Sequence, residues 1–323
     1  MKYLVFIVFV YSFLVADEFN FEADLLQSLD EVSEIATKTK LNIDDTPSFV
    51  TVLRSKKLQK LGIENVFEAL GLVPGVQLKK EATGVPVVVF RGVTQKGEVK
   101  LMIDGVTINN AYRGSIYHYL DFPIEMIQRI EVIRGAGSVL YGSGAISGVI
   151  NIITKSSTDS SKNRVFLSGG SYNSSKAGAV VSTNLGEFRV DLDGYYQKND
   201  KSVKVEPNPS TYDGDNDRHL KDYSVGINIK DEHFSFLSRI KRSDAGNAYG
   251  AFGVLDEKIS KYNNINTSIF TQLSYKNSLN KNNNIVLLTG YNRYEQQVEE
   301  LHPAGQVDTD HKEESYFFQT DLI

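Results

Sequence analysis

The sequence predicts a compact α+β domain that is followed by a partial antiparallel transmembrane β-barrel. Short strand-like and helical segments mix over residues 46–155, which is typical of a small α+β domain. From about Arg164 onward, apolar and polar residues alternate with a period of two, as they do in strands that have one lipid face and one wet face. No later stretch has the ~20 continuous apolar residues that a membrane helix requires. If this chain spans a membrane, it does so with strands.

Capping and turn residues indicate where the elements of the α+β domain begin and end. Asn65 is suited to cap a helix, which Pro74-Gly75 would stop. Pro123 would open a helical turn that runs to about Gln128. Asp104-Gly105, between two apolar runs, is a strong signal for a tight turn. A strand is expected at Phe49–Leu53, and short buried strands are expected at Val87–Phe90, Val99–Ile103 and Ile130–Ile133.

Residues 162–323 have room for about eight strands of the predicted barrel. We expect the lipid face to carry Val190, Leu192, Val225, Ile227 and Ile229. Short connections are expected at Leu185-Gly186 and Lys230–His233, and long polar loops at Asn199–Arg218, Ser243–Ser260 and Glu299–Glu313. Short turns on one side and long loops on the other are typical of outer-membrane barrels, and a soluble sandwich would not explain them. The sheet should be open, because a closed eight-stranded barrel has room only for its own side chains.

The N-terminus reads as an export signal that precedes a tether. Met1–Ala16 has one early lysine and an apolar run too short to span a bilayer comfortably, which favours a cleaved signal peptide over a membrane helix or a buried core segment. Residues 17–45 are acidic and then polar and turn-rich, as expected of a flexible tether.

Composition excludes several other classes of function. The chain has 0 cysteines, so neither a disulfide framework nor a thiolate metal site can form. A net charge of −5 without a basic block argues against nucleic-acid binding. The string Gly142–Gly148 could suggest a dinucleotide-binding loop. It leads into the β-branched VINIITK rather than into a helix, so it offers no helix N-terminus to a pyrophosphate, and we expect no enzyme.

Four motifs carry a resemblance to a known family. They read LGIENVFEALGLVPGV at Leu61–Val76, VFRGV at Val89–Val93, LMIDGV at Leu101–Val106 and IEVIRGAGSVLYGSGAISGVINIITK at Ile130–Lys155. Together they resemble the plug domain of TonB-dependent outer-membrane receptors, although Ala136 stands where the family commonly has proline. The resemblance covers the signal, the tether (17–45), the plug (46–155) and the first third or so of a roughly 22-stranded barrel (162–323).

The resemblance implies a receptor in the outer membrane of a Gram-negative bacterium. Such a receptor takes up an iron chelate (siderophore), haem or cobalamin and is energised through TonB and its inner-membrane complex. It has no catalytic residues, no metal site and no cofactor, and it contacts outer-membrane lipid. Two alternatives stay open: a surface receptor that binds without transport, and an inactive truncated fragment.

The resemblance also assigns three groups of residues. The TonB box, the segment that adds a strand to TonB, would be Glu31, Val32, Ser33, Glu34, Ile35, Ala36 and Thr37, with a plain disordered tether as the alternative. Ligand-binding plug loops would present Ala82, Thr83, Asn109, Asn110, Tyr112, Arg113, Tyr117, His118 and Tyr119. Tyr117 and Tyr119 could instead seal the plug against the barrel, and His118 could ligate haem iron. Arg91 and Arg134 would pair with carboxylates on the barrel wall rather than being solvated.

Overall fold

A computed structural model describes most of the chain after residue 48. The described residues are 32–33, 41–42, 49–80, 85–94, 97–110, 114–135, 141–156, 163–205, 214–246, 261–280, 283–302 and 305–322. The chain divides into one unit over residues 1–47 and another over 48–323. In the first unit, β1 (Val32–Ser33) pairs antiparallel with β2 (Leu41–Asn42). The expected signal peptide and most of the tether lie outside the described residues.

The α+β domain is built on a five-stranded mixed sheet in the order β3-β9-β10-β7-β8, in which β10 and β7 are parallel. A three-stranded sheet, β4-β5-β6, completes it. The elements are β3 (Phe49–Arg54), α3 (Ser55–Lys60), α4 (Val66–Leu70), β4 (Val76–Lys80), β5 (Pro86–Phe90), β6 (Val93–Thr94), β7 (Val99–Ile103), β8 (Val106–Thr107), η2 (Tyr117–Tyr119), η3 (Ile124–Met126), β9 (Ile127–Arg134) and β10 (Gly148–Thr154). All four expected strands are therefore present. No helix in the described ranges is long and apolar enough to cross a membrane.

Local chemistry explains where these elements start and turn. The Asn65 side chain accepts a hydrogen bond from the Glu68 amide at 2.9 Å, which confirms the predicted cap of α4. Asp104 and Gly105 both have positive φ, 50° and 83°, as a tight hairpin turn between β7 and β8 requires. The turn after Pro123 is shorter than expected, because the chain enters β9 directly after η3.

The glycine-rich string does not form a nucleotide-binding loop. Its last glycine, Gly148, begins β10, whose seven residues are all buried between β9 and β7. The string leads into strand and turn over residues 148–156 rather than into a helix, so it offers no helix N-terminus to a phosphate, and the dinucleotide alternative is wrong.

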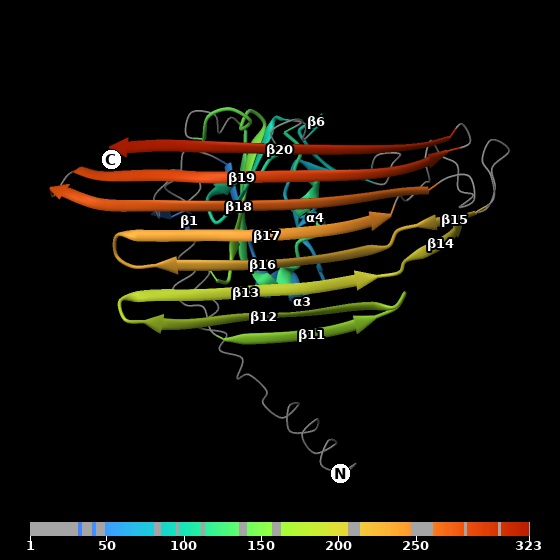
Figure 1. Ribbon diagram of the computed structural model, residues 1–323, viewed down its shortest axis with the longest axis horizontal. Coiled ribbons are helices and arrows are strands. Elements are labelled where there is room, and N and C mark those ends of the chain that lie inside the picture. Colours follow the sequence, from blue (N-terminus) through green and yellow to red (C-terminus); the bar gives the residue numbers. More distant parts are fainter. Residues whose placement is uncertain are drawn as a thin grey trace, which may run out of the picture. The chain divides into compact units, whose positions relative to one another are not determined.

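The second part of the unit is an open antiparallel sheet of eight long strands, as predicted. Its order is β11-β12-β13-β16-β17-β18-β19-β20, and Figure 1 shows these strands running side by side. They span β11 (Arg164–Gly170), β12 (Ser174–Leu185), β13 (Phe188–Asn199), β16 (Leu220–Lys230), β17 (Phe234–Gly246), β18 (Lys261–Asn280), β19 (Asn283–His302) and β20 (Gly305–Leu322). A small hairpin of β14 (Ser202–Val205) and β15 (Gly214–Asp217) stands between β13 and β16.

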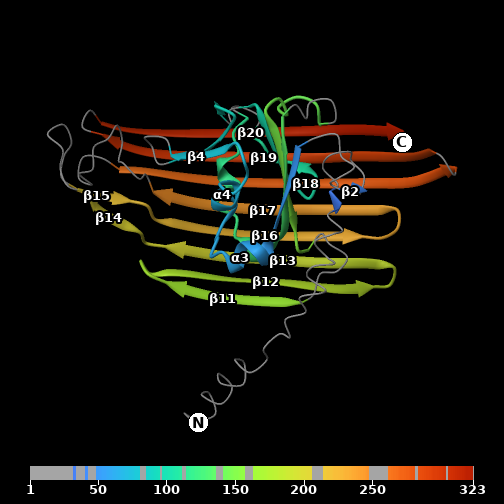
Figure 2. The same ribbon diagram turned by 180° about the vertical axis from the view of Figure 1, so that it is seen from behind.

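The two faces of this sheet differ in polarity. Its inner face, which packs on the α+β domain, buries polar side chains such as Asp191, Asp193 and Asp222. Its outer face, turned away from that domain, exposes Leu192 and Val225 at 48% and 56%. All five residues expected on the lipid face lie on this outer face by strand alternation. The reverse view in Figure 2 shows the short elements of the α+β domain against the long strands.

The predicted connections are partly confirmed. β12 and β13 turn at Gly186, and β16 and β17 turn where the Asp231 carboxylate accepts hydrogen bonds from two following amides. The long loop expected at Glu299–Glu313 is wrong, because β19 and β20 stay paired from Ile285↔Leu322 up to His302↔Gly305. Polarity alone misled the prediction, since backbone hydrogen bonds hold a hairpin together whatever its side chains are.

Candidate functional site

The candidate site is the interface between the α+β domain and the inner face of the sheet. Tyr117 on η2 carries one group of contacts there. Its hydroxyl lies 2.9 Å from the Tyr294 hydroxyl and receives a hydrogen bond from the Gln296 amide at 2.6 Å. Tyr294 donates in turn to the Asn266 side chain at 2.6 Å. This network joins η2 to β18 and β19 through uncharged groups, which can exchange partners with water at little cost.

A buried ion pair carries the second group of contacts. The Arg239 guanidinium donates two parallel hydrogen bonds of 2.8 Å to the two oxygens of Asp193. Asp193 also accepts a 2.6 Å hydrogen bond from the hydroxyl of Ser156, just after β10 of the α+β domain. The Arg239 guanidinium lies 5.4 Å from the ring centre of Phe122. The pair on the sheet is therefore held from the other side by a hydroxyl and an aromatic face of the α+β domain.

Gly226 explains how this ion pair can form. Asp193 lies opposite Gly226 in the register of β13 and β16, and Gly226 lies opposite Arg239 in the register of β16 and β17. The pair thus reaches across an intervening strand. A Cβ at Gly226 would stand 2.5 Å from an Arg239 nitrogen and 2.8 Å from an Asp193 oxygen, so only glycine leaves room for the two side chains.

A second buried cation stands beside the first. Lys241 Nζ lies 2.7 Å from Asp222 Oδ1 and 5.6 Å from the ring centre of Tyr119. Asp222 also accepts hydrogen bonds from Tyr195 and Gln197, both at 2.9 Å. The Gln197 amide reaches the α+β domain as well, since it donates to a backbone carbonyl there at 2.8 Å. The charges of this cluster on the inner face are therefore balanced by partners on the sheet itself.

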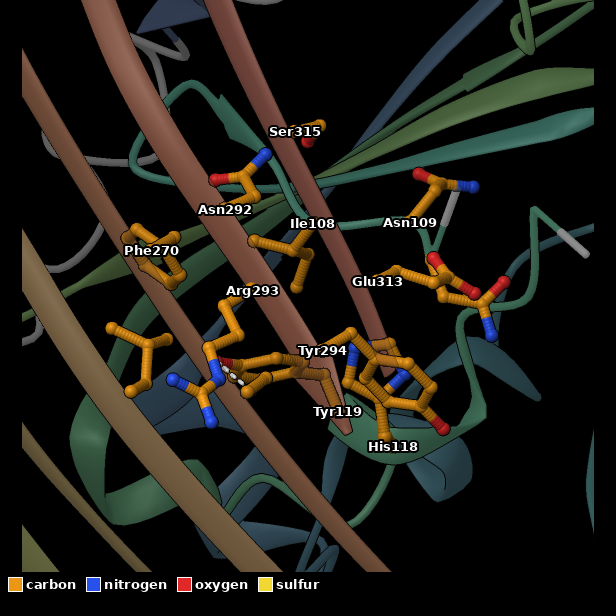
Figure 3. A pocket seen from close by; sticks show the side chains of 13 residues that line it. Ile108, Asn109, His118, Tyr119, Phe270, Asn292, Arg293, Tyr294, Glu313 and Ser315 are labelled. Carbon is orange, nitrogen blue, oxygen red and sulfur yellow. Dashed lines mark hydrogen bonds between the residues drawn. The ribbon is translucent and has the colours of Figure 1, made fainter. Parts of the chain in front are cut away.

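A small cavity of about 30 Å³ lies at the same interface, between η2 and strands β18 to β20. Figure 3 shows the rings of His118, Tyr119 and Tyr294 gathered at one side of it. Asn292 and Glu313 are among the other polar residues that line it. One water molecule needs about 10–15 Å³ of such space, so this cavity has room for a few water molecules but not for a nutrient chelate.

Burial sets the protonation of the aromatic cluster. His118 is only 5% exposed, and desolvation lowers the pKa of its imidazole to about 3, with the nearby positive charge of Lys241 adding to the effect. Desolvation also raises the pKa of Tyr119 to about 12, although a hydrogen bond from Ser268 opposes this shift. Both side chains are therefore neutral near pH 7.

We expect acid to weaken the fold through His118. Below pH 6.5 the unfolded chain binds a proton at this residue and the folded protein does not, so the free energy of unfolding falls as the pH drops from 6.5 toward 3. At pH 5 the loss is about 2 kcal/mol. The variant His118→Phe keeps a ring in this place but has no group that binds a proton. Its unfolding midpoint should therefore differ less between pH 7 and pH 5 than that of the wild type. An unchanged difference in the variant would contradict the assignment.

The structure describes only part of the group of expected ligand-binding residues. Ala82, Thr83, Tyr112 and Arg113 lie outside the described residues. Asn109 bridges backbone groups of its own domain: its amide donates to the Val99 and Gly114 carbonyls, and its oxygen accepts from the Leu101 amide. The Asn110 oxygen accepts from the Ser115 amide at 3.0 Å.

The three ring residues of that group are partly or wholly enclosed. Tyr117 is half-buried, whereas His118 and Tyr119 are 5% and 0% exposed. The contacts of Tyr117 and Tyr119 with the sheet fit the sealing alternative, and a ligand-binding role for the nine residues stays a prediction.

The assignments of the TonB box and of the two arginines that would pair with the barrel wall also stay predictions. Val32 and Ser33 of the expected TonB box are extended in β1, and its other five residues lie outside the described ones. Arg91 is exposed, with φ of 48°. Arg134 donates to the Pro74 carbonyl at 3.1 Å within the α+β domain.

Sequence reasoning missed the residues that hold the interface together, above all Asp193, Arg239 and Lys241. A signal was present, because charged residues occur at alternate positions in strands that otherwise read as membrane-spanning. Such residues must face inward, where a wet lumen or a second domain compensates them.

Comparisons with known proteins agree with this arrangement. Residues 42–149 match the family model of the TonB-dependent Receptor Plug Domain. A vitamin B12 transporter, BtuB, of Vibrio vulnificus is 33% identical over 150 residues, which are 46% of this chain and 24% of that protein. BtuB of Vibrio cholerae is 26% identical over 257 residues, which are 77% of this chain and 41% of that protein.

Solved structures show the same fold. The ferric yersiniabactin uptake receptor FyuA of Yersinia pestis has a TM-score of 0.63 at 16% identity, over 85% of this chain and 46% of that one. A variant of the ferric enterobactin receptor PfeA of Pseudomonas aeruginosa has a TM-score of 0.64 at 15% identity, over 90% and 48%. The chain spans less than half the length of each of these relatives.

Proposed function

The chain belongs to the TonB-dependent receptors, with a plug domain followed by part of the receptor barrel, and we propose that its full-length form imports a nutrient across the Gram-negative outer membrane. The cargo is an iron chelate (siderophore), haem or cobalamin, and TonB supplies the energy through the N-terminal box. Residues 1–16 direct export and are removed. The family is non-enzymatic, so the proposed activity involves no chemical conversion.

One observation carries this proposal: the plug packs on the polar face of a sheet whose opposite face is apolar. In a soluble sandwich the apolar face would be the buried one. Here Asp193, Asp222 and Arg239 are buried against the plug, while Leu192 and Val225 are exposed. This polarity is expected of a barrel wall whose polar face lines a lumen that the plug occupies and whose apolar face contacts the lipid bilayer.

The contacts between plug and wall suit a plug that must be displaced. They include hydrogen bonds of Tyr117, Ser156 and Asp193, whose groups water can satisfy once the plug has moved. The sheet does contribute Leu237 and Phe270 to the apolar cluster of the plug, which holds the resting state closed.

Among the three cargo classes, the sequence relatives support cobalamin. Vitamin B12 transporters match this chain in sequence, that of Vibrio cholerae over 77% of its length, whereas the siderophore receptors match in fold at 14–18% identity. The cavity at the interface, which has room for a few water molecules, is no cargo site. The cargo must therefore bind to surfaces other than this cavity.

The test is growth of the source bacterium after disruption of the intact gene, on limiting cobalamin and on single iron sources. We expect growth to be lost on one source and restored by the gene supplied in trans. Deletion of TonB should give the same defect. Growth that depends on the gene but not on TonB would indicate a receptor that binds without energised transport, and unchanged growth on every source would contradict the import of these nutrients.

A further inference from the structure

The plug contacts different strands of the wall through different kinds of interaction. On β12 and β13 these contacts include an ion pair and packed aromatic rings. Lys176 Nζ of β12 lies 3.2 and 3.3 Å from the two carboxylate oxygens of Glu125 in η3. The Phe122 ring of the plug stands edge-on to the Tyr195 ring of β13, with 5.3 Å between the ring centres. Separating the plug from these strands would break the ion pair and expose apolar surface, and both are costly.

The apolar cluster of the plug extends into the same part of the wall. It includes Val180 of β12, Tyr195 of β13, Leu237 of β17 and Phe270 of β18, all of them buried. In the part of the chain that the structure describes, this cluster draws no side chain from β19 or β20. Because the free energy of apolar burial grows with the area removed from water, it holds the plug against β12 to β18 rather than against β19 and β20.

The contacts of the plug with β19 are hydrogen bonds between uncharged groups. Tyr294 and Gln296 lie 2.9 and 2.6 Å from the Tyr117 hydroxyl. The side-chain amide of Asn292 donates to the Thr107 carbonyl at 3.2 Å. Water can replace each of these partners at little cost. We call these five residues the polar seam.

Packing along the polar seam is incomplete. The cavity of about 30 Å³ lies here, and Figure 3 shows His118 and Asn292 among the residues around it. Within the described residues, His118 Nδ1 and Asn292 Oδ1 are buried acceptors without a hydrogen-bond partner. Water normally satisfies such acceptors, so we expect water in this cavity. The Glu313 carboxylate also lines it and lies 2.8 Å from the His311 ring of its own strand.

We propose that cargo passes between the plug and strands β19 and β20, where the plug separates from the wall along the polar seam while its contacts with β12 to β17 persist. This inference rests on the import proposed above. When force displaces the plug, contacts that water can replace give way before the ion pair and the apolar contacts do. The cavity is too small for cargo, so the seam must widen. Its amide and hydroxyl groups then face the passage, where they can bind polar groups of the cargo in turn.

The test links the plug to the wall on one side at a time. The chain has 0 cysteines, so it contributes no competing thiol to a pair of introduced ones. Y117C/Q296C bridges the polar seam, and the matched control E125C/K176C bridges the ion-paired side. In each pair two long side chains meet at their tips, so one thiol-reactive linker with a reducible disulfide can serve both. Uptake of radiolabelled cobalamin, and of ferric siderophore in parallel, is measured in cells that carry full-length receptor variants.

Each variant is compared with its own unlinked state. We expect linkage of Y117C/Q296C to abolish uptake and linkage of E125C/K176C to leave most of it. Cleavage of the linker by a reductant should restore uptake in the first variant. Cargo binding to the cells before linkage checks that the variants fold, and T107C/N292C is a second seam pair if the first does not fold.

Every other pattern overturns the inference. Loss in both linked variants would mean that the plug leaves the wall as one body, and loss in neither would place the passage along another part of the wall. Loss only in E125C/K176C would put the passage on the ion-paired side. If the unlinked wild type takes up neither cargo, the proposed import fails and this inference falls with it. A pattern that changes only on linkage concerns the passage alone.

Discussion

Replacing Arg239 with methionine is expected to lower the free energy of unfolding of the receptor by about 3–5 kcal/mol. Arg239 is 1% exposed and donates two hydrogen bonds to Asp193, which is 5% exposed. Methionine fills a similar volume but leaves the carboxylate buried with a single hydroxyl, that of Ser156, as its donor. Removing one partner of a buried pair is costly because the remaining charge is left uncompensated. The measurement is urea unfolding in detergent, followed by circular dichroism.

Two further variants separate the ion pair from the loss of a long side chain. Arg242→Met changes an outward-facing, exposed arginine of the same strand and should shift stability by less than about 0.5 kcal/mol. The double variant Asp193→Leu with Arg239→Met should recover much of the loss, because apolar residues often replace a buried pair without cost. If Arg239→Met were as mild as Arg242→Met, the pair would not be a determinant of stability.

The features of the fold that could be predicted are those whose signals are local. Asn65 caps α4 because its own side chain reaches an amide three residues on, and Asp104-Gly105 turns because both residues adopt positive φ. Strand alternation placed Leu192 and Val225 on the outer face for the same reason, since side chains alternate along any strand.

The contacts of the site depend on register between distant strands, which local patterns do not contain. Asp193 and Arg239 are 46 positions apart, and they meet only because Gly226 lies in the same row of the sheet. The polarity of these strands could place both charges on the inner face, but it could not pair them.

Polarity also misled where it was used alone. The polar stretch Glu299–Glu313 was predicted as a loop, yet most of it pairs as strand. These side chains are polar although they belong to a paired hairpin and not to a loop in bulk water.

Proline at Ile35 is expected to abolish uptake while surface binding of the cargo stays within about twofold of the wild type. We propose that TonB pairs with the backbone of Glu31–Thr37, as in recognition by strand addition. Val32 and Ser33 of this segment are already extended, and they pair with Leu41 and Asn42 in β1 and β2. Proline removes the amide donor of residue 35 and fixes its φ, so a strand of TonB cannot pair through this position.

The measurement compares binding and energised uptake of radiolabelled cobalamin, and of ferric siderophore in parallel, in cells that carry full-length receptor variants. Ile35→Ala is the matched control, because it shortens the side chain but keeps the amide, and it should retain most of the uptake. Parallel loss of binding and uptake in Ile35→Pro would show that the segment supports the fold rather than the energy coupling. Normal uptake in that variant would place the contact with TonB elsewhere in residues 17–45. Because backbone pairing and not side-chain identity is what the proline removes, only the contrast between these two variants identifies strand addition as the means by which force reaches the plug.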